Sequence, residues 1–336
     1  MEIAQSVNLQ AYNTFGVPAT AAFFASIESK ENLEKALQYA AGESLPTLVL
    51  GGGSNVLFIR DYAGLVLHIN NRGIKWLEGL AGDSQRVRVA AGENWHEFVS
   101  ACLAKELYGL ENLALIPGTV GAAPIQNIGA YGVELADFFV ELSCYDREQN
   151  QWLSLTREQC EFAYRDSLFK RSGGRYLVFD ITLELDKDWK PNLSYQALAG
   201  VIGEVDPSAQ QVFDTVCSLR REKLPDPNDL GNAGSFFKNP IVSDEKYAAL
   251  QKQLPGLPNY AIEEEGLTKI PAAWLLDQLG WKGRRRGRAQ VHKHHALILV
   301  NPGYALGEDI LLLAQEMSSS VLENFGIALE PEVQIL

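Results

Sequence analysis

The most specific segment of this chain reads PGTVGAAPIQNIGAYG and spans residues 117–132. Its glycines and prolines interrupt any long helix, and it carries no charged residue, which is unusual for a solvated loop. Small residues allow a flat ligand to lie directly against the main chain. A tightly packed core loop is the alternative. The segment therefore predicts a buried turn system built against a ligand.

A second glycine motif, residues 51–55 (GGGSN), follows an expected buried strand at residues 45–50. A second apolar strand, residues 56–59, comes next, whereas the dinucleotide fingerprint would open a helix here. Successive backbone N–H groups and the side chains of Ser54 and Asn55 suit a pyrophosphate. A plain hairpin turn is the alternative.

A third loop, residues 231–240 (GNAGSFFKNP), presents a serine between a glycine and two aromatic residues. Gly234 lets the backbone turn sharply and removes a Cβ that would crowd a ligand next to Ser235. Most Gly-Ser pairs are ordinary turns, so this loop gains weight only from its agreement with the other two segments.

Length and composition restrict the class of protein. With 336 residues, 46% hydrophobic and 21% charged, the chain predicts an ordinary globular protein of two or three domains. Its net charge of −13 disfavours nucleic acid as a partner. No secretion signal and no apolar run of the ~20 residues needed for membrane insertion is evident. Four widely spaced cysteines (Cys102, Cys144, Cys160, Cys217) fit reduced thiols, so we expect a cytoplasmic protein. We also expect the protein to be a monomer.

Hydrophobic periodicity predicts helices and strands without regular βαβ alternation, which indicates an α+β class. Residues 176–185 alternate apolar and polar side chains, as a half-buried strand requires. The break at Pro225–Asn228 is the candidate domain boundary. We expect helices at residues 29–41, 94–107, 206–222, 243–254, 271–279 and 307–324, and further strands at 87–91, 138–145, 151–155 and 296–300.

Five motifs occur in a fixed order: GGGSN (51–55), IPGTVGAAPIQNIGAYG (116–132), YRDS (164–167), GNAGSFFKNP (231–240) and LEPEV (329–333). In this the chain resembles the UDP-N-acetylenolpyruvoylglucosamine reductase family, flavoenzymes of bacterial peptidoglycan precursor synthesis, over residues 13–332. The resemblance implies two FAD-binding lobes of the vanillyl-alcohol-oxidase/PCMH type, residues 1–68 and 69–220. A C-terminal α+β substrate-binding domain, residues 221–336, would close over the substrate and return its tail to the active site. The glycine-rich segments predict FAD that is bound without a covalent link.

The resemblance also implies the reaction. NADPH would reduce the flavin, whose N5 would pass a hydride to UDP-N-acetylglucosamine enolpyruvate and yield UDP-N-acetylmuramate. Such a site needs a cation or acid at the substrate carboxylate and a proton donor at the adjacent carbon. By family position Ser235 is the proton donor, and Arg165 and Glu332 stabilise the enolate-like intermediate. The alternatives are a surface pair of Arg165 with Asp166, a solvent-facing Glu332 in a C-terminal strand, and an ordinary turn at Ser235.

The resemblance assigns further residues to the ligands. Tyr195 matches a substrate-phosphate tyrosine on a loop that marks one subgroup of the family. Lys223, Arg220 and Asn239 are candidate substrate contacts, although a lysine at a helix end is often only a solvated cap. The expected FAD contacts are Gly51, Gly52, Gly53, Ser54, Asn55, Pro117, Gly118, Gly121, Ala122, Gln126, Asn127, Gly129, Ala130, Tyr131 and Gly132.

Two remaining clusters have competing interpretations. The basic run of residues 282–288 could attract ligand phosphates, but a solvated loop is favoured because most of its arginines match no motif. His292, His294 and His295 lie close in sequence, yet no carboxylate or cysteine accompanies them, so we expect no metal. His295 precedes a strand and could line the site.

Two other functions compete with the reductase. An FAD-dependent oxidase could use the same flavin fold on another substrate. A catalytically silent nucleotide-binding protein would lack at least one of Ser235, Arg165 and Glu332, and all three are present.

Overall fold

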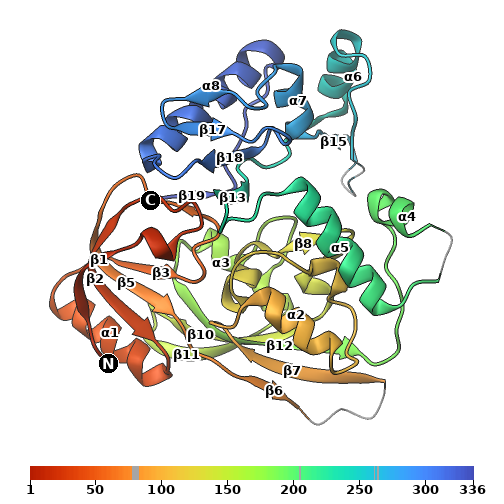
Figure 1. Cartoon of the computed structure of the whole chain (residues 1–336). Coiled ribbons are helices and arrows are strands. Elements are labelled where there is room, and N and C mark those ends of the chain that lie inside the picture. The colour runs from red at the N-terminus through yellow and green to blue at the C-terminus, as the bar shows by residue number, and fades with distance from the viewer. Residues whose placement is uncertain (78–82, 204–205, 261, 263–264) are drawn as a thin grey trace. The chain divides into compact units, whose positions relative to one another are not determined.

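The structure, a computed structural model, describes residues 1–77, 83–203, 206–260, 262 and 265–336 (Figure 1). Chain contacts divide it into two compact units. Unit 1 contains residues 1–7, 21–52 and 63–222, and unit 2 contains residues 8–20, 53–62 and 223–336. Separate sheets mixed with helices confirm the α+β class. The three-part division at residues 68 and 220 stays a prediction.

The first sheet of unit 1 has the order β1-β2-β5-β3. Helix α1 (Lys30–Gly42) begins at Ser29, whose side chain accepts a hydrogen bond from the Asn32 amide, and it buries Leu33, Ala36 and Ala40. These apolar side chains belong to the same core as those of the central strands. The strands are β1 (Ala4–Asn8), β2 (Thr20–Ile27), β3 (Thr47–Leu50) and β5 (Tyr62–Ile69).

The turn after β3 is not a hairpin. Strand β3 pairs in parallel with β5, whereas the short β4 (Val56–Leu57) pairs in parallel with β19 (Gln334–Ile335). The glycine motif therefore leads the chain from one sheet to a different strand pair, which excludes the plain hairpin that the sequence left open. The chain also passes from unit 1 to unit 2 between Gly52 and Gly53.

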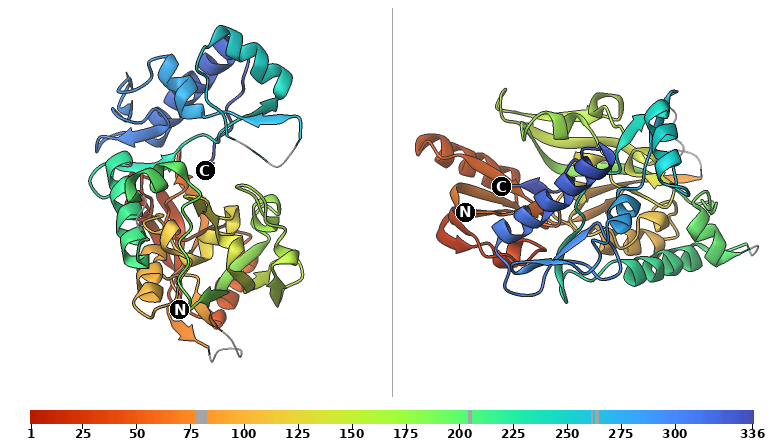
Figure 2. Two further views of the ribbon diagram at one scale, coloured as in Figure 1. Left: turned by 90° about the vertical axis from the view of Figure 1, so that its right-hand side faces the viewer. Right: turned by 90° about the horizontal axis from the view of Figure 1, so that it is seen from above.

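The second sheet of unit 1 is antiparallel, with the order β11-β10-β12-β7-β6. Helices α2 (Trp95–Leu103) and α5 (Ala209–Lys223) lie next to each other beside it (Figures 1 and 2). His96 of α2 stacks on Phe213 of α5 at 5.4 Å between ring centroids. The strands are β6 (Ile74–Trp76), β7 (Ser84–Ala90), β10 (Phe139–Asp146), β11 (Gln151–Thr156) and β12 (Tyr176–Asp186).

Strand β12 corrects the expectation of a half-buried strand. Its pairing with β10 skips one residue, since Ser143 faces Asp180 and Cys144 faces Val178. This bulge reverses the alternation, so that Leu177 and Phe179 join one core while Val178 and Ile181 join the other. Both faces of β12 are therefore buried along most of its length.

Helix α2 is shorter than expected. Asn94 caps it by accepting the Glu97 amide at 3.0 Å, but the helix ends at Leu103 rather than Leu107. Glu106 takes a positive φ of 56°, and the Leu107 amide turns back to the Cys102 carbonyl. Leu107 is buried in the core although it follows the end of the helix. Hydrophobic periodicity alone cannot distinguish such a residue from one in a further helical turn.

Short elements complete unit 1. They connect the second sheet to the segments that carry the candidate site. They are α3 (Leu168–Arg171), α4 (Gln196–Ile202), β8 (Gly129–Ala130), β9 (Val133–Glu134) and the 3₁₀ helices η2 (Glu111–Leu113), η3 (Val120–Gln126), η4 (Leu135–Asp137) and η5 (Glu158–Cys160).

Unit 2 is built on the sheet β13-β18-β17-β16, against which helix α8 (Gly307–Phe325) packs. Gly326 ends α8 with a left-handed φ of 62°, a conformation that glycine adopts readily. Two excursions from the N-terminal half join this unit, and Thr14 on one of them accepts the Asn232 amide at 2.9 Å. The other elements are η1 (Gln10–Tyr12), β13 (Gly231–Ser235), β14 (Ile241–Ser243), α6 (Asp244–Gln253), β15 (Leu267–Lys269), α7 (Ala272–Gln278), β16 (Arg285–Arg286), β17 (Ala289–Val291) and β18 (Ile298–Asn301).

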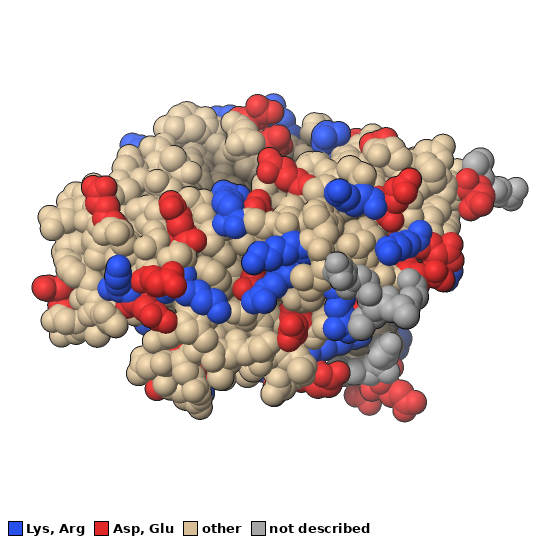
Figure 3. Space-filling view, turned by 90° about the horizontal axis from the view of Figure 1, so that it is seen from below, with Lys and Arg blue, Asp and Glu red and all other residues tan. Residues whose placement is uncertain are grey.

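The surface carries charges of both signs. On the face drawn in Figure 3, basic and acidic side chains are interspersed. Arg86 pairs with Glu184, and Arg88 pairs with Asp180. Among the described residues, no helix combines the length and the apolar character that crossing a membrane demands.

Candidate active site

The two glycine segments of unit 1 pack main chain against main chain. A Cβ on Gly52 would lie 3.0 Å from the Gly118 Cα, and one on Gly51 would lie 2.5 Å from the Thr119 Oγ1. A Cβ on Gly121 would lie 2.4 Å from the Ala91 Cβ. Glycine suits these approaches: Gly52 meets the Gly118 backbone directly, Gly51 lies against the Thr119 side chain, and Gly121 lies against Ala91. This arrangement fits a dinucleotide pyrophosphate held by main-chain amides.

Backbone strain gathers in the same region. Leu115, Asn127, Tyr131 and Arg165 all take positive φ values, between 44° and 58°, although none is a glycine. Leu115 is held on both sides, since its amide donates to Nδ1 of His96 at 3.1 Å and its carbonyl accepts from Arg220 at 3.1 Å. Strained residues of this kind cluster at functional sites, where surrounding contacts fix them.

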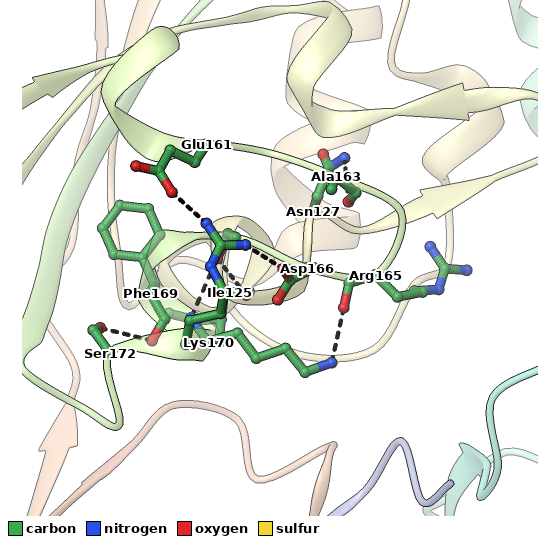
Figure 4. A network of polar contacts seen from close by, with 11 residues as sticks. Ile125, Asn127, Glu161, Ala163, Arg165, Asp166, Phe169, Lys170 and Ser172 are labelled. Atoms are coloured by element: carbon green, nitrogen blue, oxygen red, sulfur yellow. Dashed lines mark hydrogen bonds and ion pairs between the residues drawn. The ribbon is translucent and has the colours of Figure 1, made fainter. Parts of the chain in front are cut away.

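Arg165 occupies the tip of a tight turn. The amides and carbonyls of Ala163 and Asp166 bond reciprocally at 3.1 Å, which leaves Tyr164 and Arg165 at the two central positions. A positive φ at the second central position normally requires glycine or asparagine. Lys170 donates to the Arg165 carbonyl at 2.8 Å, and the Arg165 side chain points away from that network (Figure 4). Its guanidinium donates to the Gly129 carbonyl at 2.8 Å.

The neighbours of Arg165 brace this turn. Asp166 is ion-paired with Arg171, which also pairs with Glu161 at 2.6 Å, so the acid beside Arg165 is engaged elsewhere. The buried Ser167 donates to the Ile125 carbonyl at 2.6 Å and caps α3. Asn127 directs its carboxamide into the protein, where it meets Glu134, Ala163 and Ala136. Its expected role as a cofactor contact stays a prediction.

Tyr195 lies beside Tyr131 in unit 1. The two rings meet edge to face with centroids 5.3 Å apart. Burial raises the pKa of Tyr131, while the positive charge of Arg220 opposes that shift. Burial lowers the pKa of the Arg220 guanidinium, and Arg165 adds to that effect. The structure thus gathers two cations and two phenols of the predicted site, a combination suited to an anionic ligand.

Sequence reasoning missed the polar pair Glu111–Asn112 of η2. Both residues are 2% exposed. Asn112 donates one bond to the Tyr131 carbonyl at 2.8 Å and one to the Asn192 carbonyl at 2.9 Å. Burial raises the pKa of Glu111 to about 7, although its carboxyl group accepts the Gly109 amide at 2.8 Å. Two polar residues in an otherwise apolar stretch were the available signal.

Ser235 lies in unit 2 at the end of β13, just after a bulge. The register with β18 shifts between Asn232 and Ser235, and Gly234 takes a φ of 70°. The buried Asn232 fixes the bulge by accepting the Gly234 amide at 2.9 Å and donating to the Leu230 carbonyl at 2.8 Å. Phe236 follows, fully buried. Ser235 therefore lies between a bulge that Asn232 stabilises and the buried side chain of Phe236. An ordinary surface turn would not fix the backbone of a serine on both sides in this way.

Glu332 lies beside the serine loop. Its amide donates to the Phe236 carbonyl at 2.8 Å, and its carbonyl accepts from the Asn55 side chain at 3.1 Å. Glu332 precedes β19 rather than lying in it, so its expected position within a C-terminal strand is wrong. Segments some 280 residues apart therefore bring Asn55, Ser235 and Glu332 into one region of unit 2.

The other unit 2 candidates have individual settings. Asn239 accepts the Ala272 amide at 3.0 Å at the start of α7, which fixes the direction of its side chain. Lys223 is exposed at the end of α5. Burial lowers the pKa of His295, with a contribution from Lys223. In the basic run, Lys282 pairs with Asp277 and Arg286 with Glu316, but Arg285 and Arg286 form strand β16, so the expected solvated loop is in part a strand.

Side chains that could bind a metal or form a disulfide do not come together among the described residues. Within the described ranges, no three histidine, cysteine or acidic side chains group as a metal site would require. The four cysteines are free and buried. Burial raises the pKa of the Cys144 and Cys160 thiols to about 12, so these thiols are unreactive.

Comparisons with known proteins agree with the arrangement. Residues 21–152 match the FAD binding domain family, and residues 226–336 match the C-terminal domain family of UDP-N-acetylenolpyruvoylglucosamine reductase. Similar solved structures include the reductase of Thermus caldophilus, with a TM-score of 0.68, 24% identity and coverage of 99% of this chain and 98% of that one. A solvent-stable cholesterol oxidase aligns with a TM-score of 0.50 and 10% identity over 98% of this chain and 86% of that one. These matches confirm the two-lobed FAD-binding fold with its additional C-terminal domain.

Curated relatives extend over the whole chain. UDP-N-acetylenolpyruvoylglucosamine reductase of Pseudomonas putida is 44% identical over 333 residues, which are 98% of this chain and 97% of the relative. The protein of the same name from Paraburkholderia phytofirmans is 47% identical over 96% of this chain and 95% of its own length. The chain therefore belongs to the UDP-N-acetylenolpyruvoylglucosamine reductase family and is an FAD-dependent oxidoreductase.

Proposed function

We propose that this protein uses FAD and NADPH to reduce UDP-N-acetylglucosamine enolpyruvate to UDP-N-acetylmuramate, a cytoplasmic step of peptidoglycan precursor synthesis. One observation carries the proposal: the bond from the Glu332 amide to the Phe236 carbonyl joins the serine loop to the C-terminal tail. The serine loop (residues 231–240) and the tail segment (residues 329–333) are two of the motifs on which the family resemblance rests. This hydrogen bond brings them into direct contact.

FAD would be held without a covalent link by the glycine segments. In unit 1 the main chain of residues 51–52 and 117–132 would contact it, and in unit 2 Gly53, Ser54 and Asn55 would do so. Bound FAD would supply the hydride that adds to the enolpyruvyl double bond. The close packing of Gly52 on Gly118 supports this assignment, because a side chain there would push the two segments apart.

The remaining chemistry falls to side chains of this chain. Negative charge develops on the substrate carboxylate during the reduction, and Arg165 and Glu332 would stabilise it as a cation and an acid. Ser235 would hold the proton that passes to the adjacent carbon. The strained turn beneath Arg165 and the braced bulge beneath Ser235 support these roles, because each fixes the position of a side chain.

Substrate phosphates would be bound by charged and hydroxyl groups. We assign this role to Tyr195 and Arg220, with Lys223 and Asn239 as further contacts. Proximity of Tyr195, Tyr131 and Arg220 supports the assignment for the first two. The presence of the Tyr195 loop would place the protein in the family subgroup that has one.

A two-step flavin assay tests the proposal. The purified protein should be yellow, NADPH should bleach it under anaerobic conditions, and UDP-N-acetylglucosamine enolpyruvate should restore the colour within the turnover time. An oxidase of the same fold would instead be recoloured quickly by oxygen and not by the UDP-sugar. Failure of the UDP-sugar to reoxidise the bleached protein would overturn the proposed function.

A further inference from the structure

We infer that Asn112 is a positioning residue for substrate binding, because it holds the loop of residues 192–195 (the tyrosine loop) against the glycine segment of residues 117–132. This inference rests on the proposed function, in which Tyr195 binds a substrate phosphate. Asn112 itself is buried and would touch neither substrate nor flavin.

The geometry makes Asn112 a cross-link between the two segments. Its side-chain amide has two hydrogens, one of which reaches the Tyr131 carbonyl at 2.8 Å and the other the Asn192 carbonyl at 2.9 Å. The first acceptor belongs to the glycine segment and the second to the tyrosine loop. Since the Asn112 side chain is buried, neither acceptor can be supplied equally well by bulk water when the amide is removed.

Further contacts define the same docked arrangement. Asn192 donates to the Gly132 carbonyl at 3.3 Å, and Ser194 donates to the Asn192 side chain at 2.7 Å. A Cβ on Gly132 would lie only 2.2 Å from the Ser194 Oγ, so the loop rests directly on the glycine. The docked loop places the Tyr195 ring against the Tyr131 ring.

The surroundings of residues 192–195 indicate that this loop can detach without unfolding the rest of unit 1. Leu198 of α4 is fully buried, so the chain after the loop is anchored in the core independently of Asn112. Asn192, Ser194 and Tyr195 are exposed, so apart from the partly buried Leu193 their other anchors are the contacts with Gly132 and Tyr131. Losing the cross-link should therefore release the loop tip while the fold survives. The apparent substrate affinity is then the intrinsic affinity multiplied by the fraction of molecules in which the loop stays docked.

Asn112→Asp tests the inference, because it keeps the side-chain shape and replaces the two N–H donors with acceptors. We expect the KM for the UDP-sugar to rise about tenfold or more, while FAD content and the rate of flavin reduction by NADPH stay unchanged. Asn150→Asp, at an exposed turn position, introduces the same charge and serves as the control. It should leave the KM, the FAD content and the rate of flavin reduction unchanged. Asn112→Ala, which removes both N–H donors without adding charge, replaces the aspartate variant if that protein does not fold.

A double-mutant cycle with Tyr195→Phe separates positioning from a merely structural role. If Asn112 acts through the tyrosine loop, Tyr195→Phe should raise KM in the native background and much less in the Asn112→Asp background. Additive effects on KM, or equal losses in both half-reactions, would overturn the inference. Wild-type protein that fails to turn over the UDP-sugar would instead refute the proposed function, so the two failures are distinguishable.

Discussion

Replacing Glu111 by glutamine should stabilise the protein in a pH-dependent way. Glu111 is 2% exposed, and burial raises the pKa of its carboxyl group from 4.5 to about 7. Below pH 4.5 the group is protonated in both the folded and the unfolded protein. As the pH rises through this window, the unfolded chain loses the proton first, so the native state loses stability until the folded carboxyl also ionises near pH 7.

The size of the effect follows from the pKa difference. A change of about 2.5 pKa units corresponds to about 3 kcal/mol of stability. Part of that penalty is already present at pH 5, so about 2–3 kcal/mol should separate pH 5 from pH 8. Glutamine does not ionise, and its carbonyl oxygen can still accept the Gly109 amide that the carboxyl group accepts at 2.8 Å. Glu111→Gln should therefore remove most of this dependence.

Urea unfolding at pH 5 and at pH 8 measures the difference. Relative to wild type, Glu111→Gln should gain about 2–3 kcal/mol more at pH 8 than at pH 5. Glu106→Gln, an exposed glutamate five residues earlier, serves as the control and should show no such trend. An equal effect of Glu111→Gln at both pH values, or a greater loss at pH 8, would refute the reasoning about this buried carboxyl group.

Three further predictions concern the cofactor and the reacting groups. Arg165→Met should slow reduction of the enolpyruvyl substrate far more than flavin reduction by NADPH in stopped-flow traces; equal losses would mean that Arg165 serves the flavin or the fold. Gly121→Ala should weaken FAD binding several-fold and cost about 1–3 kcal/mol, because its Cβ would meet Ala91 at 2.4 Å; fluorescence titration checks this, with Gly200→Ala, which has open space around its Cβ, as the control. Acid denaturation and centrifugation should leave the flavin in the supernatant, whereas flavin in the pellet would contradict non-covalent binding.

The sequence predicted most of the regular elements and the motif residues, because both depend on local patterns. Helices α1 and α8 follow directly from their hydrophobic periodicity. Strand β12 was found, but its bulge depends on pairing with β10, a non-local choice that alternation in one strand does not encode. The end of α2 was misplaced because buried residues continue after the helical stop.

The candidate site divides in the same way. The family resemblance pointed to Arg165, Ser235 and Glu332 as candidates, but the strained turn under Arg165 and the bulge under Ser235 appear only in three dimensions. Asn112 was missed because its partners lie 19 and 80 residues away, and no local motif marks a buried amide that bridges two loops. Such cross-links depend on tertiary packing, which motif spacing does not specify.

The turnover of Ser235→Ala tests the central claim most directly. Ser235 is the last residue of β13, which is held by its pairing with β18. Removing the serine hydroxyl should therefore preserve the fold, the bound FAD and the rate of flavin reduction by NADPH. Losing a positioned general acid should lower the rate of UDP-N-acetylmuramate formation by about 10²–10⁴-fold. Ser235→Cys should keep part of the activity, because a thiol can also donate a proton. Near-normal turnover of the alanine variant, with its fold intact, would contradict the assignment of Ser235 as the proton donor.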